Sequence, residues 1–390
     1  MCSVIRGMVL GGIASAMIVV SSSAAQDPAG ELLSVSVGSV HACGVSAAGA
    51  IYCWGNGRYG QLGNGAAEDS ELAPVRVRSA VRFRMVTAGA THSCALARDG
   101  SAYCWGTDVS GVLGDADLTE RCDGTPCATT PTPVARGMRF DTLAAGYEHS
   151  CALRRGRAYC WGRNAEGQLG RERSGEECGG VACGRAALAV DTALRFRAIS
   201  VRGRHSCALS GEDAYCWGDN EYGQLAAPRA VSSSATPLRV ATAWPLRSVT
   251  AGGLYGCALT RRGEVACWGR VPLEEGAQGP ETRGARLLFG ERDAPRFVSL
   301  GVGGEHACAL AADGGIHCWG AGLYNRLGAQ PAERCGEIPC SRVPLRLSLT
   351  SRYHTLSVGG TSSCAIAADR LTCWGGSAAE SAVARSLASR

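Results

Sequence analysis

Seven copies of the triplet Cys-Trp-Gly constrain the fold of this chain more than any other feature. The triplets begin at Cys53, Cys104, Cys160, Cys216, Cys267, Cys318 and Cys373. A second cysteine precedes each triplet by nine or ten residues, at Cys43, Cys94, Cys151, Cys207, Cys257, Cys308 and Cys364. Because the units recur every 50 to 57 residues, the chain must be a repeat architecture rather than a set of unrelated domains.

Each pair of cysteines brackets a predicted β-hairpin. Where the cysteines are ten residues apart, a three-residue loop ends in Gly49, Gly100, Gly263 or Gly314, as a left-handed turn position requires. Where they are nine apart, a two-residue loop remains: Arg155-Gly156, Gly211-Glu212 or Ala368-Asp369. Loop length and cysteine spacing change together, so the two sulfurs stay opposite each other on one face. The pairs therefore predict cross-strand disulfides.

Two further strands complete each unit. One precedes the hairpin (33–37, 83–87, 140–144, 196–201, 246–251, 297–302 and 355–358), and a shorter one follows it, as in 74–77 and 133–135. Both faces of the hairpins are apolar, so each sheet needs a neighbour on either side. A solenoid would need polar capping repeats, which the ends lack. We therefore predict an all-β, seven-bladed β-propeller of four-stranded blades, stapled by disulfides. Its hairpins are expected near 41–55, 92–106, 149–162, 205–218, 255–269, 306–320 and 362–375.

The unit also resembles a known repeat. It reads Gly-x-x-His-x-Cys, then Tyr-Cys-Trp-Gly, then Tyr-Gly-Gln-Leu-Gly, as in Gly38 to His41, Trp54-Gly55 and Tyr59 to Gly63. This pattern is similar to the regulator of chromosome condensation repeat over roughly residues 31–376, and that resemblance implies a seven-bladed propeller. The pattern is broken by Arg202 in unit 4 and by Tyr255 and Ser362 in units 5 and 7, which also lack the Gly-Gln-Leu-Gly turn. Those two blades are expected to be irregular.

The two chain ends are expected to close the ring. Few residues follow Trp374, so the strand 33–37 is predicted to join the seventh blade, with 382–387 supplying the short strand of that blade. Closure would remove the exposed sheet edges that template aggregation.

Three insertions interrupt the period, and each carries its own cysteine pair: Cys122/Cys127, Cys178/Cys183 and Cys335/Cys340. All follow the Leu-Gly turn, so they should emerge on the same face of the disc. Two hypotheses remain open: the insertions recognise a partner, or they are stapled only to resist proteolysis. The candidate partner-binding residues are Glu120, Arg121, Glu176, Glu177, Glu333 and Arg334.

The N-terminus is typical of a secretory signal peptide over residues 1–25, which leaves 26–390 as a single propeller. Arg6 precedes an apolar run from Met8 to Val20, and the small residues Ser23 and Ala25 provide a cleavage site. The run is too short for a transmembrane anchor. Cleavage removes Cys2 and leaves twenty cysteines, an even number that full pairing requires. The chain is therefore expected to be exported, either extracellular or periplasmic.

Metal, cofactor and catalytic hypotheses find little support in the sequence. Five histidines share one slot (His41, His92, His149, His205 and His306), but the same slot on successive blades does not converge on one ion. We expect each histidine to hydrogen-bond within its own blade. The cysteine spacing suits disulfides better than zinc, and the known nucleophile, zincin and phosphate-loop motifs are missing. No catalytic residue, metal or cofactor is predicted.

The net charge is +5, from 39 arginines and 34 acidic residues. The arginines are scattered among acids along the chain, so no nucleic-acid partner is expected. The leading hypothesis is an exported, monomeric, non-enzymatic module that binds a protein or a surface polymer. The resemblance suggests an extracellular inhibitor like the propeller-type β-lactamase inhibitor as one alternative. A propeller enzyme such as a polysaccharide lyase is a second alternative. The guanine-nucleotide exchange known in the family is disfavoured by the signal peptide.

Overall fold

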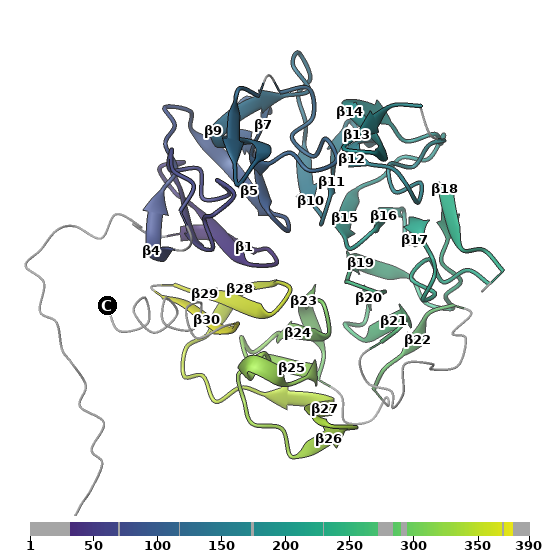
Figure 1. Ribbon diagram of the computed structural model, residues 1–390. Coiled ribbons are helices and arrows are strands. Elements are labelled where there is room, and N and C mark those ends of the chain that lie inside the picture. The colour runs from purple at the N-terminus through teal and green to yellow at the C-terminus, as the bar shows by residue number, and fades with distance from the viewer. Residues whose placement is uncertain are drawn as a thin grey trace, which may run out of the picture.

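Seven β-sheets surround a central axis in the computed structural model, as Figure 1 shows. The model describes residues 32–68, 71–116, 118–172, 175–228, 230–271, 284–289, 295–368 and 370–376. Six sheets have four or five strands and the last has three, so the predicted seven-bladed, all-β propeller is confirmed. We number these blades 1 to 7 in chain order. Within these ranges no helix has the length and apolarity needed to cross a membrane.

Each blade begins at the axis and proceeds outwards. The inner strands are β1 (Leu32–Val37), β5 (Phe83–Ala88), β10 (Thr142–Ala145), β15 (Ala198–Arg202), β19 (Leu246–Ala251), β23 (Phe297–Val302) and β28 (Tyr353–Val358). The second strands are β2 (His41–Ser46), β6 (His92–Ala97), β11 (His149–Arg154), β16 (His205–Ser210), β20 (Tyr255–Thr260), β24 (His306–Ala311) and β29 (Ser362–Ala367).

The third strands carry the Cys-Trp-Gly triplets. They are β3 (Ile51–Gly55), β7 (Ala102–Thr107), β12 (Arg157–Arg163), β17 (Asp213–Asp219), β21 (Val265–Gly269), β25 (Ile316–Ala321) and β30 (Leu371–Gly375). The fourth strands are β4 (Glu71–Arg76), β9 (Thr125–Val134), β14 (Val181–Ala189), β18 (Ser233–Arg239), β22 (Arg286–Leu287) and β27 (Ile338–Arg346). Blades 2, 3 and 6 add a fifth strand at the rim: β8 (Glu120–Cys122), β13 (Glu177–Cys178) and β26 (Glu333–Cys335).

The strand registers divide the disc into two faces. In blade 1, His41 pairs with Gly55 at one end of the hairpin and Val45 pairs with Ile51 at the other. We call the first end the Trp-Gly face and the second, where the turns of the cysteine hairpins lie, the turn face. The same arrangement repeats in every blade, so equivalent residues of different blades lie on the same face.

Ten disulfides link the cysteines in the pairs that the spacing predicts. Seven join opposed residues of the second and third strands, with Cα separations of 4.0–4.1 Å, and three staple the insertions at 5.7–5.8 Å. The hairpin turns also agree with prediction, because Gly49, Gly100, Gly263 and Gly314 all have φ between 80° and 86°. A residue with a Cβ is strained in that conformation.

The shared histidines bond between blades, so the prediction that each bonds within its own blade is wrong. His41 Nε2 lies 2.7 Å from Ser93 Oγ of the next blade, and His92 Nε2 lies 3.0 Å from Ser150 Oγ. His149–Ser206 and His306–Ser363 repeat the contact at 2.9 Å. The register between blades brings the serine of one unit under the histidine of the preceding unit.

The triplet tryptophans add a second bond between blades. Trp105 Nε1 donates to the carbonyl of Gln61 in the preceding blade at 2.8 Å, and the Ser93 hydroxyl donates to the same carbonyl at 3.0 Å. Since Ser93 uses its proton there, His41 must carry its own proton on Nε2 and donate to Ser93. Trp161, Trp217 and Trp268 bond equivalent carbonyls at 2.9–3.0 Å. The Gly-Gln-Leu-Gly turn, or its variant in a given unit, therefore holds the following blade through this carbonyl, and we call it the clamp turn.

We expect Ser150→Ala to lower the free energy of unfolding by about 1–3 kcal/mol, because it leaves the buried His92 Nε2 without its partner. Urea unfolding of S150A, H92A and the double variant would measure this. A coupling energy near zero in that double-mutant cycle would show that the contact contributes nothing.

Ring closure differs from the prediction. Strand β1 pairs with β2 of blade 1 rather than joining the seventh blade, since each unit supplies its own inner strand. Packing and hydrogen bonds close the ring instead: Val35, Val37 and Trp54 share a cluster with Cys364 and Ile366 of blade 7, and the Gly360 N–H donates to the Gly38 carbonyl at 2.9 Å. The predicted strand at 382–387 lies outside the described residues. Blades 5 and 7 are irregular as expected, with a two-residue fourth strand and three described strands respectively.

Arg202, which breaks the glycine pattern of the repeat, reaches across the axis. Its guanidinium donates to the carbonyls of Val37 in blade 1 and Val358 in blade 7, at 3.3 and 3.0 Å. The leading glycines Gly38, Gly89, Gly303 and Gly359 approach the carbonyl of the next leading glycine closely. A Cβ on Gly38 would lie 2.3 Å from the Gly89 carbonyl oxygen, so a side chain does not fit there. Blade 4 keeps a close backbone contact through Gly203, where a Cβ would lie 2.4 Å from the Gly253 carbonyl oxygen, and Arg202 adds a bridge through the centre of the ring.

Candidate functional site

The three stapled insertions occupy equivalent places in blades 2, 3 and 6. In each blade the second cysteine pairs with the residue that follows the Trp-Gly of the third strand, as in Cys127 opposite Thr107. The insertions therefore extend the Trp-Gly end of their blades at the rim, visible for β13 and β26 in Figure 1. The prediction that they emerge on the same face is confirmed.

Two of these hairpins are fixed to the neighbouring blade. Arg58 of blade 1 forms an ion pair with Asp123 at the tip of the blade 2 hairpin, at 3.1 Å. Arg185 of blade 3 forms one with Asp108 of blade 2 at 3.0 Å, and the Asp108 side chain is only 2% exposed. Burial raises the pKa of Asp108, and the guanidinium of Arg185 and the N–H of Leu113 oppose that rise. These contacts give the hairpins a structural role at the seams between blades.

Three of the six predicted partner-binding residues hold the hairpins together. Glu120, Glu176 and Glu333 all stand two residues before the first cysteine, and each contacts the residue two positions after the second cysteine. Glu120 accepts bonds from the N–H and hydroxyl of Thr129 at 2.8 and 2.7 Å. Glu176 accepts the N–H of Arg185 at 3.2 Å, and Glu333 pairs with Arg342 at 3.2 Å.

The other three predicted residues point to solvent. Arg121, Glu177 and Arg334 are exposed, and the two arginines bond carbonyls of their own turns, those of Gly124 and Glu337. They are the residues of this set that a partner can reach without disturbing the hairpin. Sequence reasoning found the set but could not separate these two roles. The contacts of Glu120, Glu176 and Glu333, which we call the glutamate clasps, depend on the strand register.

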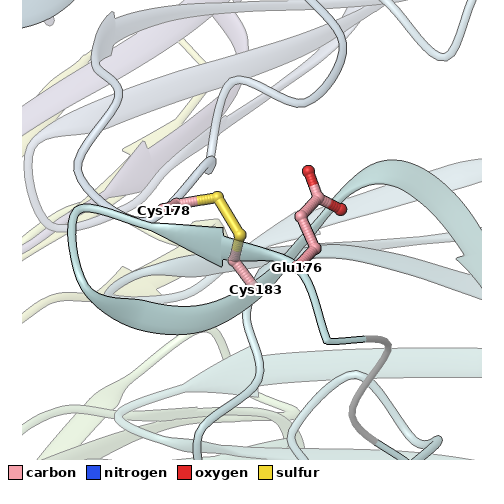
Figure 2. Close-up of side chains that lie close together, drawn as sticks. All are labelled: Glu176, Cys178 and Cys183. Carbon is pink, nitrogen blue, oxygen red and sulfur yellow. A yellow bond between two sulfur atoms is a disulfide. The ribbon is translucent and has the colours of Figure 1, made fainter.

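One group of potential metal ligands lies close together in the described part of the chain. Figure 2 shows Glu176 beside Cys178 and Cys183, whose ligand atoms lie within 4.8 Å of one another. The two sulfurs form a disulfide, however, and a disulfide offers no thiolate to a metal. The Glu176 carboxylate also pairs with Arg185 at 3.6 Å. The donor set does not fit a metal.

Aromatic side chains project from the same face near the hairpins. Tyr222 and Tyr324 occupy the same slot of the repeat and are 37% and 64% exposed. A guanidinium lies over each ring: Arg270 at 5.5 Å from the Tyr222 centroid and Arg326 at 5.6 Å from Tyr324. Exposed tyrosine and arginine side chains are enriched at the energetic centres of protein interfaces. Sequence analysis missed this pair, although both tyrosines precede the clamp turn.

The histidine–serine contacts have the geometry of a nucleophile and its base, but a substrate has no access to the serine hydroxyl. His92 and Ser150 are completely buried between blades, and His92 Nδ1 has no partner to orient it. A substrate cannot reach a hydroxyl in that position. The same contact occurs four times around the ring, which indicates a structural role.

Family comparisons agree with the repeat count. The family described as "Regulator of chromosome condensation (RCC1) repeat" matches residues 48–96 with one model. A second model of the same repeat matches residues 33–61, 86–111, 140–168, 196–224 and 297–326. These five stretches fall on blades 1, 2, 3, 4 and 6, which carry the clamp turn or a variant of it.

Similar curated proteins include one from a plant and one from an animal. The chain is 29% identical to the ultraviolet-B receptor UVR8 of Arabidopsis thaliana over 78% of its own length and 65% of that protein. It is 27% identical to the E3 ubiquitin-protein ligase HERC2 of Mus musculus over 73% of this chain. The chain spans only 6% of HERC2 and less than two thirds of UVR8.

Solved structures share the fold at low identity. Human WBSCR16 aligns with a TM-score of 0.74 and 19% identity over 87% of each chain. Prp20p of Saccharomyces cerevisiae, studied for its binding to Gsp1p and histones, aligns at 0.69 and 21% identity over 91% of this chain and 85% of that one. The family models thus identify regulator of chromosome condensation (RCC1) repeats in five of the seven blades, and the solved structures share the fold.

Proposed function

We propose that this chain is an exported, non-enzymatic binding module that docks a protein on its Trp-Gly face. The observation that carries the proposal is that three blades each have a disulfide-stapled hairpin at the same end. A hairpin held by a disulfide loses less conformational entropy on docking than a free loop. Arg121, Glu177 and Arg334 then provide charged contacts, and Tyr222 and Tyr324 provide aromatic anchors on the same face.

The proposed compartment follows from the cysteines. Ten disulfides persist in an oxidising environment and are reduced in the cytosol. This supports export, together with the signal-peptide pattern of residues 1–25, which lies outside the described residues. The scaffold roles common in RCC1-like propellers support binding rather than catalysis. We extend that role to this chain because its histidine–serine pairs are inaccessible.

The test begins with affinity capture from the native culture medium and measures the dissociation constant of the captured protein. We expect the variant R121A/E177A/R334A to bind at least tenfold more weakly, or about 1.4 kcal/mol. These three residues leave the glutamate clasps intact. The control R262A/R352A/E212A makes the same change in charge on the turn face and should bind normally. Unchanged affinity of the first variant, with the melting temperature preserved, would refute docking on the Trp-Gly face.

A further inference from the structure

The turn face carries most of the excess positive charge of the molecule. Two kinds of segment lie there: the turns between second and third strands with their flanking residues, and the three residues centred on the buried side chain that opens each inner strand. Among the described residues, these segments contain fifteen arginines and six acids. The whole chain has a net charge of +5, so the charge is segregated by face although the arginines are scattered along the sequence.

The acids on this face are already occupied. Asp99 pairs with Arg139 at 3.3 Å, Asp213 with Arg239 at 2.7 Å, and Asp313 with Arg346 at 2.8 Å. Glu212 and Glu264 pair with Arg261 and Arg296. The sixth, Asp141, accepts the backbone N–H of Arg155 and keeps its charge. Five of the six acids are therefore already paired with arginines, and only Asp141 offsets the arginines that remain.

Several of the remaining arginines bond only neutral carbonyls. Arg84 donates to the carbonyls of Phe140 and Asp141 in the next blade, at 2.8 and 2.9 Å. Arg197 repeats the contact with Leu246 and Arg247 at 3.1 and 3.0 Å. A carbonyl orients a guanidinium without neutralising it, so each keeps its full charge for an incoming anion.

The densest group of arginines spans the seam between blades 3 and 4. The turn of blade 3 supplies Arg154, Arg155 and Arg157, and the start of the next inner strand supplies Arg195 and Arg197. The two segments are joined by the bond from Phe196 N–H to the Gly156 carbonyl, at 2.7 Å. Among the described residues, none of these five side chains forms an ion pair, and all but the half-buried Arg154 are exposed. We call this group the arginine seam.

We propose that the turn face, centred on the arginine seam, binds an anionic polysaccharide. Guanidinium groups pair with carboxylate and sulfate oxygens through two parallel hydrogen bonds. An extended polymer with charges at regular intervals can contact the seam and the arginines of adjacent blades simultaneously. This site lies at the opposite end of the blades from the proposed protein-docking face, so the two proposals stand or fall separately.

The chemistry of the face favours a sugar polymer over other polyanions. Binding of single-stranded nucleic acid relies on aromatic side chains on which bases stack. The exposed aromatic rings Tyr222 and Tyr324 lie on the opposite face. Membrane binding relies on an apolar surface that inserts beside the charges. On the described turn face the large exposed apolar side chains are single residues, Leu33 and Val298.

The test is a titration of the intact, oxidised protein with dextran sulfate and with polygalacturonate, using neutral dextran as the blank. We expect binding to both anionic polymers, weakening steeply with salt because counterions are released. The variant R155Q/R157Q/R195Q should bind at least tenfold more weakly and show a shallower salt dependence. The control R121Q/R204Q/R334Q removes the same charge from the Trp-Gly face and should bind like the parent.

Three outcomes would overturn the proposal. If the parent and the seam variant bind equally well, the arginine seam is not the binding site. Equal weakening by the control would show attraction to net charge alone. Tighter binding to duplex DNA or to anionic lipid vesicles than to either polysaccharide would assign the face to a different polyanion. Melting curves of both variants establish that they are folded.

Discussion

Complete reduction of the ten disulfides is expected to unfold the propeller. Each hairpin bridge closes a loop of about ten residues and constrains the unfolded chain by roughly 2–3 kcal/mol in the chain-entropy model. Seven such bridges, even without strict additivity, are comparable to the roughly 5–15 kcal/mol that stabilises a typical domain. We therefore expect cooperative loss of near-ultraviolet circular dichroism once the chain is unfolded, reduced and returned to buffer with reductant.

The bridges should differ in their resistance to reductant while the protein is folded. Six of the seven hairpin bridges are completely buried in the blade interiors, as at Cys94 and Cys104, whereas Cys373 of the seventh bridge is half-buried. Cys335, at the rim, is half-buried. Mild reductant followed by alkylation and mass spectrometry should label the Cys335–Cys340 pair first. Labelling of Cys94 and Cys104 at the same rate, in protein that keeps its native spectrum, would contradict this order.

Paired substitutions separate the two classes of bridge. We expect C94A/C104A to lower the melting temperature by several degrees, because it removes a loop constraint and leaves a cavity in a packed core. The matched variant C335A/C340A removes a shorter loop at the rim and should have a smaller effect. Equal effects would indicate that core packing around the hairpin bridges contributes little.

The blade count and disulfides were predictable because they depend on local spacing. Strand alternation, turn length and cysteine separation are all contained within a single unit, and seven units repeat the evidence. Gly49 and Gly156, for example, stand in turns of different length, yet both keep the flanking cysteines opposed. A repeat of this kind leaves little freedom in the fold.

Contacts between blades were harder to predict, because one unit does not contain its own partner. The sequence does hold a signal that comparison of successive units could have found. A serine follows the histidine slot wherever the preceding unit has a histidine, as at Ser93 and Ser150. Where the preceding unit lacks one, alanine stands there, as at Ala42 and Ala307. His205 is the exception: the next blade offers Gly256, and both ring nitrogens lack a hydrogen-bond partner.

The charged faces were missed for a related reason. Arginines separated by about forty residues along the chain meet only when neighbouring blades pack together. The stapled insertions were found from their cysteines, but the glutamate clasps depend on strand register. Side-chain roles that arise from the assembly of units are therefore the part of the site that needed the structure.

Acid is expected to unfold the propeller through its buried histidines. Burial lowers the pKa of His41 and His149 from 6.5 to about 4, and that of His92, His205 and His306 to about 3. Neighbouring histidines lower the pKa of His92 further. Folded pKa values below the unfolded value mean that the unfolded chain binds protons first as the pH falls. The stability is therefore complete above about pH 6.5 and is lost progressively down to about pH 3–4.

The five histidines act on one cooperative ring, so their effects combine. Between the unfolded and the folded pKa values, each histidine contributes a slope of at most about 1.4 kcal/mol per pH unit, and the five slopes have the same sign. Urea unfolding followed by tryptophan fluorescence from pH 7.5 to 4.5 would measure this slope. H92Q keeps an amide donor for Ser150 without the titration, so its slope should be shallower by about one histidine, and H354Q, at an exposed histidine outside the slots, is the matched control. The free energy of unfolding would instead stay level down to pH 4.5 if water reached the five histidines in the folded ring. The histidines would then be protonated there, and the contacts between blades would break while the blades remained folded.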